Sequence, residues 1–106
     1  MSGIDRELVF SALGDGCRRQ LLDRLRLENG QTLSELCEGL GITRQAVTKH
    51  LKVLEAANLV MTRRRGRQKL HFLNPVPINA VAMRWLKQFD AVALDILATL
   101  PDGDAG

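Results

Sequence analysis

The sequence has few cysteines and no long apolar run. Cys17 and Cys37 are its two cysteines among 106 residues, too few for a disulfide framework in a domain of this kind. Its apolar runs are only a few residues long, whereas a membrane-spanning helix needs about 20 apolar residues. The first residues also lack the charged start and apolar stretch of a secretory signal. We therefore expect a cytoplasmic protein with reduced thiols and no membrane contact.

The sequence also lacks the patterns that indicate catalysis or metal binding. No serine, cysteine or carboxylate is paired with a histidine in a recognisable arrangement, and no glycine-rich loop is suited to a phosphate. A tight thiolate or imidazole site needs three or four convergent ligands. We expect His50 to pack between helices and His71 to lie on a strand. The sequence thus predicts no enzyme activity, no metal and no cofactor.

Cys17 leaves two interpretations open. It stands near the predicted start of a helix and beside Arg18 and Arg19, a setting that increases thiolate character. The simpler interpretation is a small, half-buried residue without chemistry.

Positive charge is concentrated in the middle of the chain. The whole chain carries a net charge of +3, but residues 44–72 contain eight basic residues against the single acid Glu55. This segment therefore carries +7 and the remainder −4. Such segregation is typical of a protein that binds a polyanion through one face.

Apolar periodicity predicts a mainly α-helical domain with one small β-hairpin. We expect helices over residues 5–13, 17–27, 32–40 and 43–57, strands over 59–63 and 69–73, and one long helix over 78–100. Thr32 and Glu35 have the spacing of a capping box, and Asn58 suits a left-handed helix end. No domain boundary is apparent, so residues 1–100 are predicted to form one domain, followed by a flexible tail over 101–106.

Residues 33–51 have the features of a helix-turn-helix. Gly41 tolerates the positive φ that the turn requires, and Cys37 is small enough for close approach of the two helices. The predicted apolar seam between them consists of Leu36, Leu40, Ile42, Val47, Leu51 and Leu54.

The second helix of this motif presents a polar, largely basic face that suits the major groove of DNA. Arg44 has the paired donors for guanine, and Gln45 has the donor and the acceptor for adenine, whereas Lys49 and Lys52 suit phosphates. The arginine-rich hairpin suits a minor groove or flanking phosphates. The predicted contacts to double-stranded DNA are Thr43, Arg44, Gln45, Thr48, Lys49, Lys52, Arg63, Arg64, Arg65, Arg67 and Lys69.

The last helix has an apolar arc of roughly 200°, wider than packing on one core requires. We expect a second copy of the chain to cover the apolar residues that its own core does not bury. The predicted homodimer contacts are Leu8, Val9, Leu13, Trp85, Phe89, Val92 and Ile96.

Several stretches over residues 7–98 resemble the ArsR (arsenical-resistance repressor) family of winged helix-turn-helix regulators. They are Ala12-Leu13-Gly14-Asp15, Ala46-Val47-Thr48-Lys49-His50-Leu51-Lys52-Val53-Leu54 and Arg64-Arg65-Gly66-Arg67. The resemblance implies the element order ααααββα and a homodimeric repressor that an inducer releases from its operator, an inverted repeat. Metal-sensing members carry Cys-x-Cys in the first helix of the motif, or carboxylate and histidine ligands on the last helix. Here Cys37 stands alone and the last helix has no histidine, so the chain resembles members without metal ligands, and its inducer is unknown.

Two other functions compete with a specific repressor. A non-specific architectural DNA-binding protein accounts for the charge but not for a groove-sized helix that begins with Arg44 and Gln45. A winged helix that binds proteins conflicts with the +7 segment. The sequence names neither the operator nor the regulated genes, and it leaves activation open beside repression.

Overall fold

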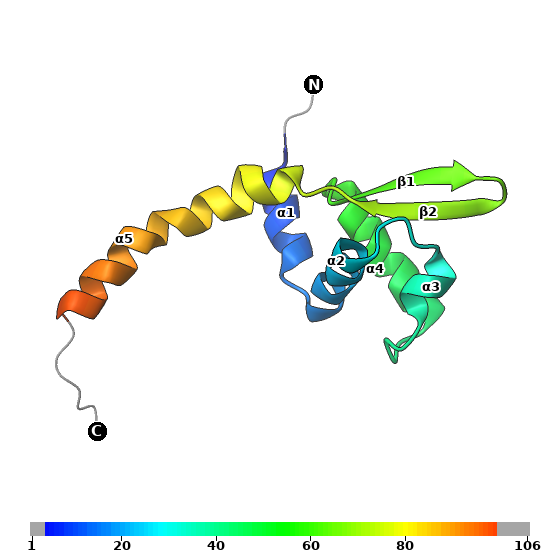
Figure 1. Cartoon of the computed structure of the whole chain (residues 1–106), viewed down its shortest axis with the longest axis horizontal. Helices are drawn as coiled ribbons and strands as arrows, with labels where there is room; N and C mark the ends of the chain where they lie inside the picture. Colours follow the sequence, from blue (N-terminus) through cyan, green and yellow to red (C-terminus); the bar gives the residue numbers. More distant parts are fainter. Residues whose placement is uncertain (1–3, 100–106) are drawn as a thin grey trace.

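The computed structural model describes residues 4–99, apart from the side chains of residues 93, 94 and 96. The helices α1 (Arg6–Leu13), α2 (Gly16–Leu27), α3 (Leu33–Cys37) and α4 (Arg44–Ala56) precede the strands β1 (Val60–Arg65) and β2 (Gln68–Leu73). The π-helical segment η1 (Ile78–Met83) then leads into α5 (Arg84–Thr99). In Figure 1 the hairpin and α5 extend from the group of helices α1–α4 in opposite directions. The predicted tail, residues 101–106, lies outside the described residues.

Each of the first four helices begins at a side chain that caps it. Asp5 and Asp15 accept backbone N–H groups of α1 and α2, and Thr43 Oγ1 accepts the N–H of Ala46 in α4. The predicted capping box is confirmed, because Thr32 accepts from the Glu35 backbone while Glu35 Oε1 accepts from the Thr32 backbone. These caps fix where each helix starts, including α4, the second helix of the helix-turn-helix. We call α4 the recognition helix, because its outer face is the one predicted to enter a DNA groove.

The turn of the helix-turn-helix is longer than predicted. α3 ends at Cys37, whereas the sequence predicted a helix to about residue 40. Gly39 and Gly41 have φ values of +75° and +73°, a conformation that glycine adopts without steric cost. The turn therefore contains two glycines with positive φ, whereas the sequence predicted only Gly41 in this role. At the other end of α4, Asn58 has the predicted left-handed conformation, with φ +61°.

The core lies between α2, α3, α4 and the start of β1. Leu21, Leu25 and Leu54 have no exposed surface, and the predicted seam is confirmed. Its members Leu36, Val47, Leu51 and Leu54 are buried, while Leu40 and Ile42 are partly buried against them. The seam holds α3 and α4 together as one unit.

The hairpin is longer and its turn tighter than predicted. β1 and β2 pair antiparallel from Val60 opposite Leu73 to Arg65 opposite Gln68, so only Gly66 and Arg67 connect them. Gly66 has φ +62°, as a two-residue hairpin turn with glycine at its first position requires. The wing is therefore a regular two-stranded ribbon, not a loose basic loop.

The predicted final helix does not begin as a regular α-helix. Residues 78–83 form a π-helical segment whose Val81 and Ala82 are buried, and η1 contacts α1. Apolar spacing did not predict this segment, since π-helical turns are rare and usually occur singly within α-helices. Within residues 4–99, no helix has the length and hydropathy needed to cross a membrane.

Candidate nucleic-acid interface

The outer face of α4 carries the polar residues that the sequence predicted there. Arg44, Gln45, Lys49 and Lys52 are exposed, and Thr48 is half-buried. These five side chains together line a shallow hollow on the helix surface. The Thr48 hydroxyl donates to the Arg44 carbonyl at 3.0 Å, so its lone pairs and its methyl group remain available at the surface. The face is thus open and rich in donors.

A groove of about 540 Å³ joins α3, α4 and the hairpin. Cationic side chains enter it from two elements, Arg44 and Lys52 from α4, and Arg64, Arg67 and Lys69 from the hairpin. Glu55 is the acid among the residues described as lining it. The recognition helix and the wing therefore share one positive surface.

The basic residues of the hairpin divide between its two faces. Arg64 and Lys69 are opposite each other in the sheet and both line the groove. Side chains along a strand alternate between faces, so Arg63 and Arg65 lie on the other face, and neither lines the groove. The sequence predicts a single basic surface on the hairpin, whereas the strand register divides its basic residues between two faces.

Polar residues at the start of α3 and of β2, which the sequence did not predict as DNA contacts, also line the groove. Thr32, Ser34 and Gln68 are among them. Ser34 Oγ accepts a hydrogen bond of 3.1 Å from Nη1 of Arg44, which restrains the guanidinium at the start of the recognition helix. Exposed polar positions on a short helix give no sequence signal of this kind, because the contact depends on the angle between α3 and α4.

Two arginines of α2 are half-buried and hold the ends of other helices. Nε and Nη2 of Arg18 donate to the carbonyls of Ala12 and Ser11 at 2.9 and 3.0 Å, at the end of α1. Nη1 of Arg24 donates to the Leu36 carbonyl of α3 at 3.2 Å. Since the last carbonyls of a helix lack partners within it, both arginines stabilise the scaffold on which α4 lies.

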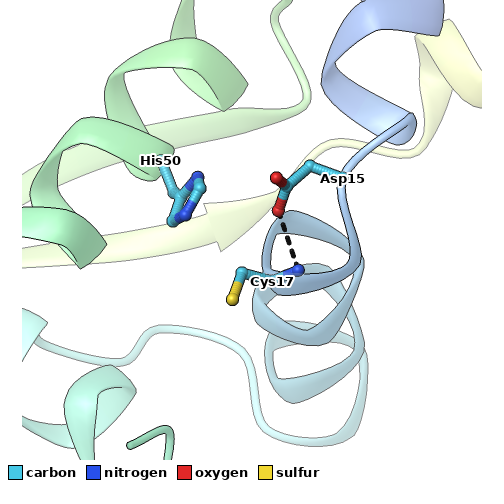
Figure 2. A group of neighbouring side chains, drawn as sticks. All are labelled: Asp15, Cys17 and His50. Atoms are coloured by element: carbon cyan, nitrogen blue, oxygen red, sulfur yellow. Dashed lines mark hydrogen bonds between the residues drawn. The ribbon is translucent and has the colours of Figure 1, made fainter. Parts of the chain in front are cut away.

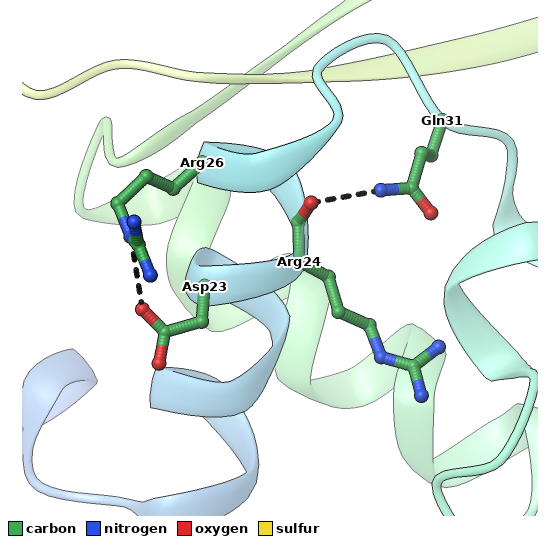
Figure 3. A network of polar contacts seen from close by, with 4 residues as sticks. All are labelled: Asp23, Arg24, Arg26 and Gln31. Carbon is green, nitrogen blue, oxygen red and sulfur yellow. Dashed lines mark hydrogen bonds and ion pairs between the residues drawn. The ribbon is translucent and has the colours of Figure 1, made fainter.

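Gln31 connects this scaffold to the wing. Figure 3 shows its Nε2 donating to the Arg24 carbonyl at 2.9 Å, beside the exposed ion pair of Asp23 and Arg26. The backbone carbonyl of Gln31 accepts from the backbone N–H of His71 at 2.8 Å and lies 2.9 Å from Nδ1 of the same histidine. His71 is buried on β2, as expected for a strand residue. The hairpin is thereby tied to the end of α2.

His50 lies against the start of α2, so it joins two segments that are far apart in sequence. Its Nδ1 is 3.3 Å from Nη1 of Arg18, and ligand atoms of Asp15, Cys17 and His50 all lie within 4.8 Å of one another (Figure 2). The backbone N–H of Arg18 above all, with that of Cys17 and the charge of Arg18, holds the pKa of Asp15 below its ordinary value of 3.8. Sequence spacing did not reveal this cluster, because 32 residues separate Arg18 from His50.

The apolar face expected to bind a second chain is exposed on α5 and part of α1. Trp85, Phe89 and Val92 are 41%, 48% and 49% exposed, and Leu8 is 40% exposed. Trp85 packs edge-on against Phe10 and Phe89, with ring centroids 5.4 and 5.0 Å apart.

Three of the predicted dimer contacts are not among these exposed residues. Val9 has no exposed surface, because it faces the interior of its own chain, so the prediction that it contacts a partner is wrong. Leu13 is half-buried against the core, and the side chain of Ile96 lies outside the described residues.

Known proteins resemble the chain in sequence and in fold. A helix-turn-helix domain family matches residues 13–63. The uncharacterized HTH-type transcriptional regulator YuzN of Bacillus subtilis (strain 168) is 39% identical over 89 residues, covering 78% of this chain and 97% of YuzN. An ArsR-like transcriptional regulator from Rhodococcus sp. RHA1 is 34% identical with a TM-score of 0.67, covering 89% of this chain and 87% of that one. The ArsR family transcriptional regulator RHA00566 has a TM-score of 0.71 at 28% identity, covering 81% of this chain and 87% of that one.

Proposed function

The chain belongs to the ArsR family of winged helix-turn-helix, DNA-binding transcriptional regulators, and we propose that it is a homodimeric repressor of an inverted-repeat operator. The observation that carries the proposal is the groove in which cationic side chains of α4 and of the hairpin meet. Such a surface lets α4 enter the major groove while the wing contacts the flanking backbone or minor groove. A regulator of this kind acts where the DNA is, in the cytoplasm.

The first turn of α4 is the proposed base-reading segment. Thr43 caps the helix, and Arg44 and Gln45 follow it with exposed side chains. Arginine and glutamine offer the paired hydrogen bonds that distinguish guanine and adenine in the major groove. Thr48, one turn later, faces the same way. Lys49 and Lys52 extend this face with point charges that suit phosphates.

The two faces of the hairpin have different proposed roles. Arg64, Arg67 and Lys69 face the groove beside α4, so they are suited to the DNA backbone next to the bases that α4 reads. Arg63 and Arg65 lie on the outer face and are suited to phosphates or a minor groove farther along the duplex.

The exposed apolar face of α5 supports the homodimer. Trp85, Phe89 and Val92, with Leu8 and the exposed part of Leu13, are large apolar contacts that water would otherwise surround. In a two-fold symmetric dimer each α5 packs against its copy. Two recognition helices would then reach two half-sites one or two DNA turns apart.

Binding to the DNA upstream of the protein's own gene tests the proposal. Fluorescence anisotropy would compare that DNA with a shuffled duplex at several salt concentrations. Arg44→Ala is expected to cost about 1–3 kcal/mol and to reduce the preference for the specific duplex. Arg65→Ala is expected to reduce the salt slope by about one while the preference remains.

Arg26→Ala is the matched control, because Arg26 is an exposed arginine of α2 paired with Asp23. It should leave binding unchanged. Equal binding to both duplexes would indicate an architectural DNA-binding protein instead. Unchanged affinity and salt slope in both Arg44→Ala and Arg65→Ala would show that the DNA surface lies elsewhere.

A further inference from the structure

Three potential metal ligands of different chemistry converge between α2 and α4. Asp15 is the capping residue of α2, Cys17 lies in its first turn and His50 lies in the middle of α4. A carboxylate oxygen, the thiol sulfur and a ring nitrogen all lie within 4.8 Å of one another, and all three residues are half-buried (Figure 2). Tetrahedral bonds of about 2.0–2.3 Å place neighbouring ligand atoms roughly 3.5 Å apart. Because the three atoms lie within 4.8 Å of one another, binding an ion requires them to approach by up to about 1.3 Å.

The carboxylate of Asp15 is held in place before any ion arrives. Its Oδ1 accepts the backbone N–H groups of Cys17 at 2.8 Å and Arg18 at 3.1 Å. Oδ2 has no hydrogen bond described in the structure, so it is the oxygen suited to an ion. The α2 N-terminus favours the negative charge of this carboxylate.

Arg18 is the cation nearest to the cluster. Its guanidinium contacts His50 Nδ1 and also donates to two carbonyls of α1. An ion on Nε2 of His50 would leave these contacts intact, while an ion on Nδ1 would cost Arg18 one of them. Thiolate and carboxylate together supply two negative charges, which neutralise a divalent cation beside the guanidinium.

We propose that Asp15, Cys17 and His50 bind a thiophilic divalent cation of the Zn²⁺ class and so join α2 to the recognition helix. Sulfur and imidazole ligands favour Zn²⁺ over Mg²⁺ or Ca²⁺, which prefer oxygen. Three protein ligands leave a fourth position for water, because the cluster is partly open to solvent. On binding, the Cys17 thiol proton passes to solvent and the thiolate sulfur becomes the ligand. The site involves neither Cys37 nor the last helix.

Cobalt(II) alone, added to the purified full-length chain without DNA, tests the site. A thiolate bound to Co²⁺ gives a charge-transfer absorption, and four-coordinate Co²⁺ gives intense visible bands. We expect both at one ion per chain, with Zn²⁺ displacing the cobalt. Cys17→Ser should abolish the charge-transfer absorption, and Cys37→Ser, the matched control with the other cysteine, should retain it.

Asp15→Asn separates ligation from the structural role of the cap. Asparagine caps a helix as well as aspartate does, but it lacks the charge, so we expect roughly tenfold or more weaker Co²⁺ binding with an unchanged circular dichroism spectrum.

Thiol alkylation keeps the proposal testable if Cys17→Ser does not fold. In folded Cys37→Ser protein, saturating Zn²⁺ should slow the alkylation of Cys17 at least tenfold relative to protein in chelator. The absence of a thiolate–cobalt absorption in the wild type, its retention in folded Cys17→Ser, or unprotected Cys17 would each overturn the proposal. DNA binding measured in chelator is independent of these outcomes, so failure of the metal site does not affect the proposed repressor function.

Discussion

The group of helices α1–α4 and the long helix α5 use apolar side chains in opposite ways. In the first region, Leu21, Leu25 and Leu54 have no exposed surface. In α5, Phe89 is 48% exposed and Leu97 is 70% exposed. The first region also has capped helix starts and arginines on helix ends, whereas the π-helical segment η1 leads straight into α5. We refer to residues 6–73 as the body and to α5 as the arm.

This difference shows which part of the chain is complete by itself. The body contains the buried core cluster around Leu21, Leu25 and Leu54, so it has the core that a small domain needs. The arm has a broad apolar face but contacts its own chain mainly near its start, where Trp85 packs on Phe10. The exposed apolar residues of the arm are therefore available to a partner, whereas the core residues of the body stabilise the fold of the single chain. Substitutions in the two regions should affect different measurements.

The largest effect is expected from a charge on the arm. Phe89→Asp places a carboxylate at the centre of the proposed dimer face, once in each subunit. Losing a central aromatic contact typically costs about 2 kcal/mol or more, so the dimer should lose about 4 kcal/mol, roughly a thousandfold in its dissociation constant. Sedimentation equilibrium measures this change. The far-UV circular dichroism spectrum of the chain should stay the same, because the substitution lies outside the body.

Leu27→Asp is the control for that experiment. Leu27 is 76% exposed at the end of α2, so the same charge there should leave assembly unchanged. An intact dimer in Phe89→Asp, or an equal loss in Leu27→Asp, would mean that the exposed face of the arm is not where the chains meet.

The next largest effect is expected from one truncation made in both regions. Leu54→Ala removes a fully buried side chain of the body and should lower the free energy of unfolding by about 3 kcal/mol. Leu97→Ala in the arm, where the side chain is 70% exposed, should change it by less than about 0.5 kcal/mol. Urea titration in the Phe89→Asp background excludes any contribution from assembly. Similar losses at both positions would show that body and arm share one core.

Local signals explain how much of the body could be predicted from sequence. The capping box of Thr32 and Glu35, the left-handed Asn58 and the seam of α3 and α4 depend on residues close together in the chain, and all are confirmed. The helix-turn-helix and the basic hairpin followed from the same kind of evidence. The apolar pattern predicts the end of α3 about three residues too late, because the turn contains Gly39, with φ +75°, as well as Gly41.

Features that depend on distant residues or on rare geometry were not predictable. The inward turn of Arg18 and Arg24 depends on which carbonyls lie opposite α2. The approach of His50 to Cys17 depends on the packing of α4. Apolar spacing is the same for a π-helical segment and for an α-helix at this length, so η1 was predicted as α-helix. The division of the wing arginines required the strand register.

The smallest effect is expected from acid, and it should belong to the body alone. The pKa of Asp15 is lowered, first by the N–H of Arg18 and also by that of Cys17, so the folded state favours the ionised carboxylate. This stabilisation is present above the pKa of the unfolded chain, about 3.9, and is lost as the pH falls through the lower folded value. Asp15→Asn retains a cap but no titrating group, so its unfolding free energy should fall less between about pH 5 and pH 3.

Urea titrations in chelator, which removes any bound metal, measure this difference. Because Asp15 lies in the body, the difference between the wild type and Asp15→Asn should be the same when both chains also carry Phe89→Asp. If the unfolding free energies of Asp15→Asn and the wild type fall equally as the pH is lowered, the cap does not couple folding to pH. A difference that disappears in the Phe89→Asp background would instead link the start of α2 to assembly, and the division between body and arm would no longer hold.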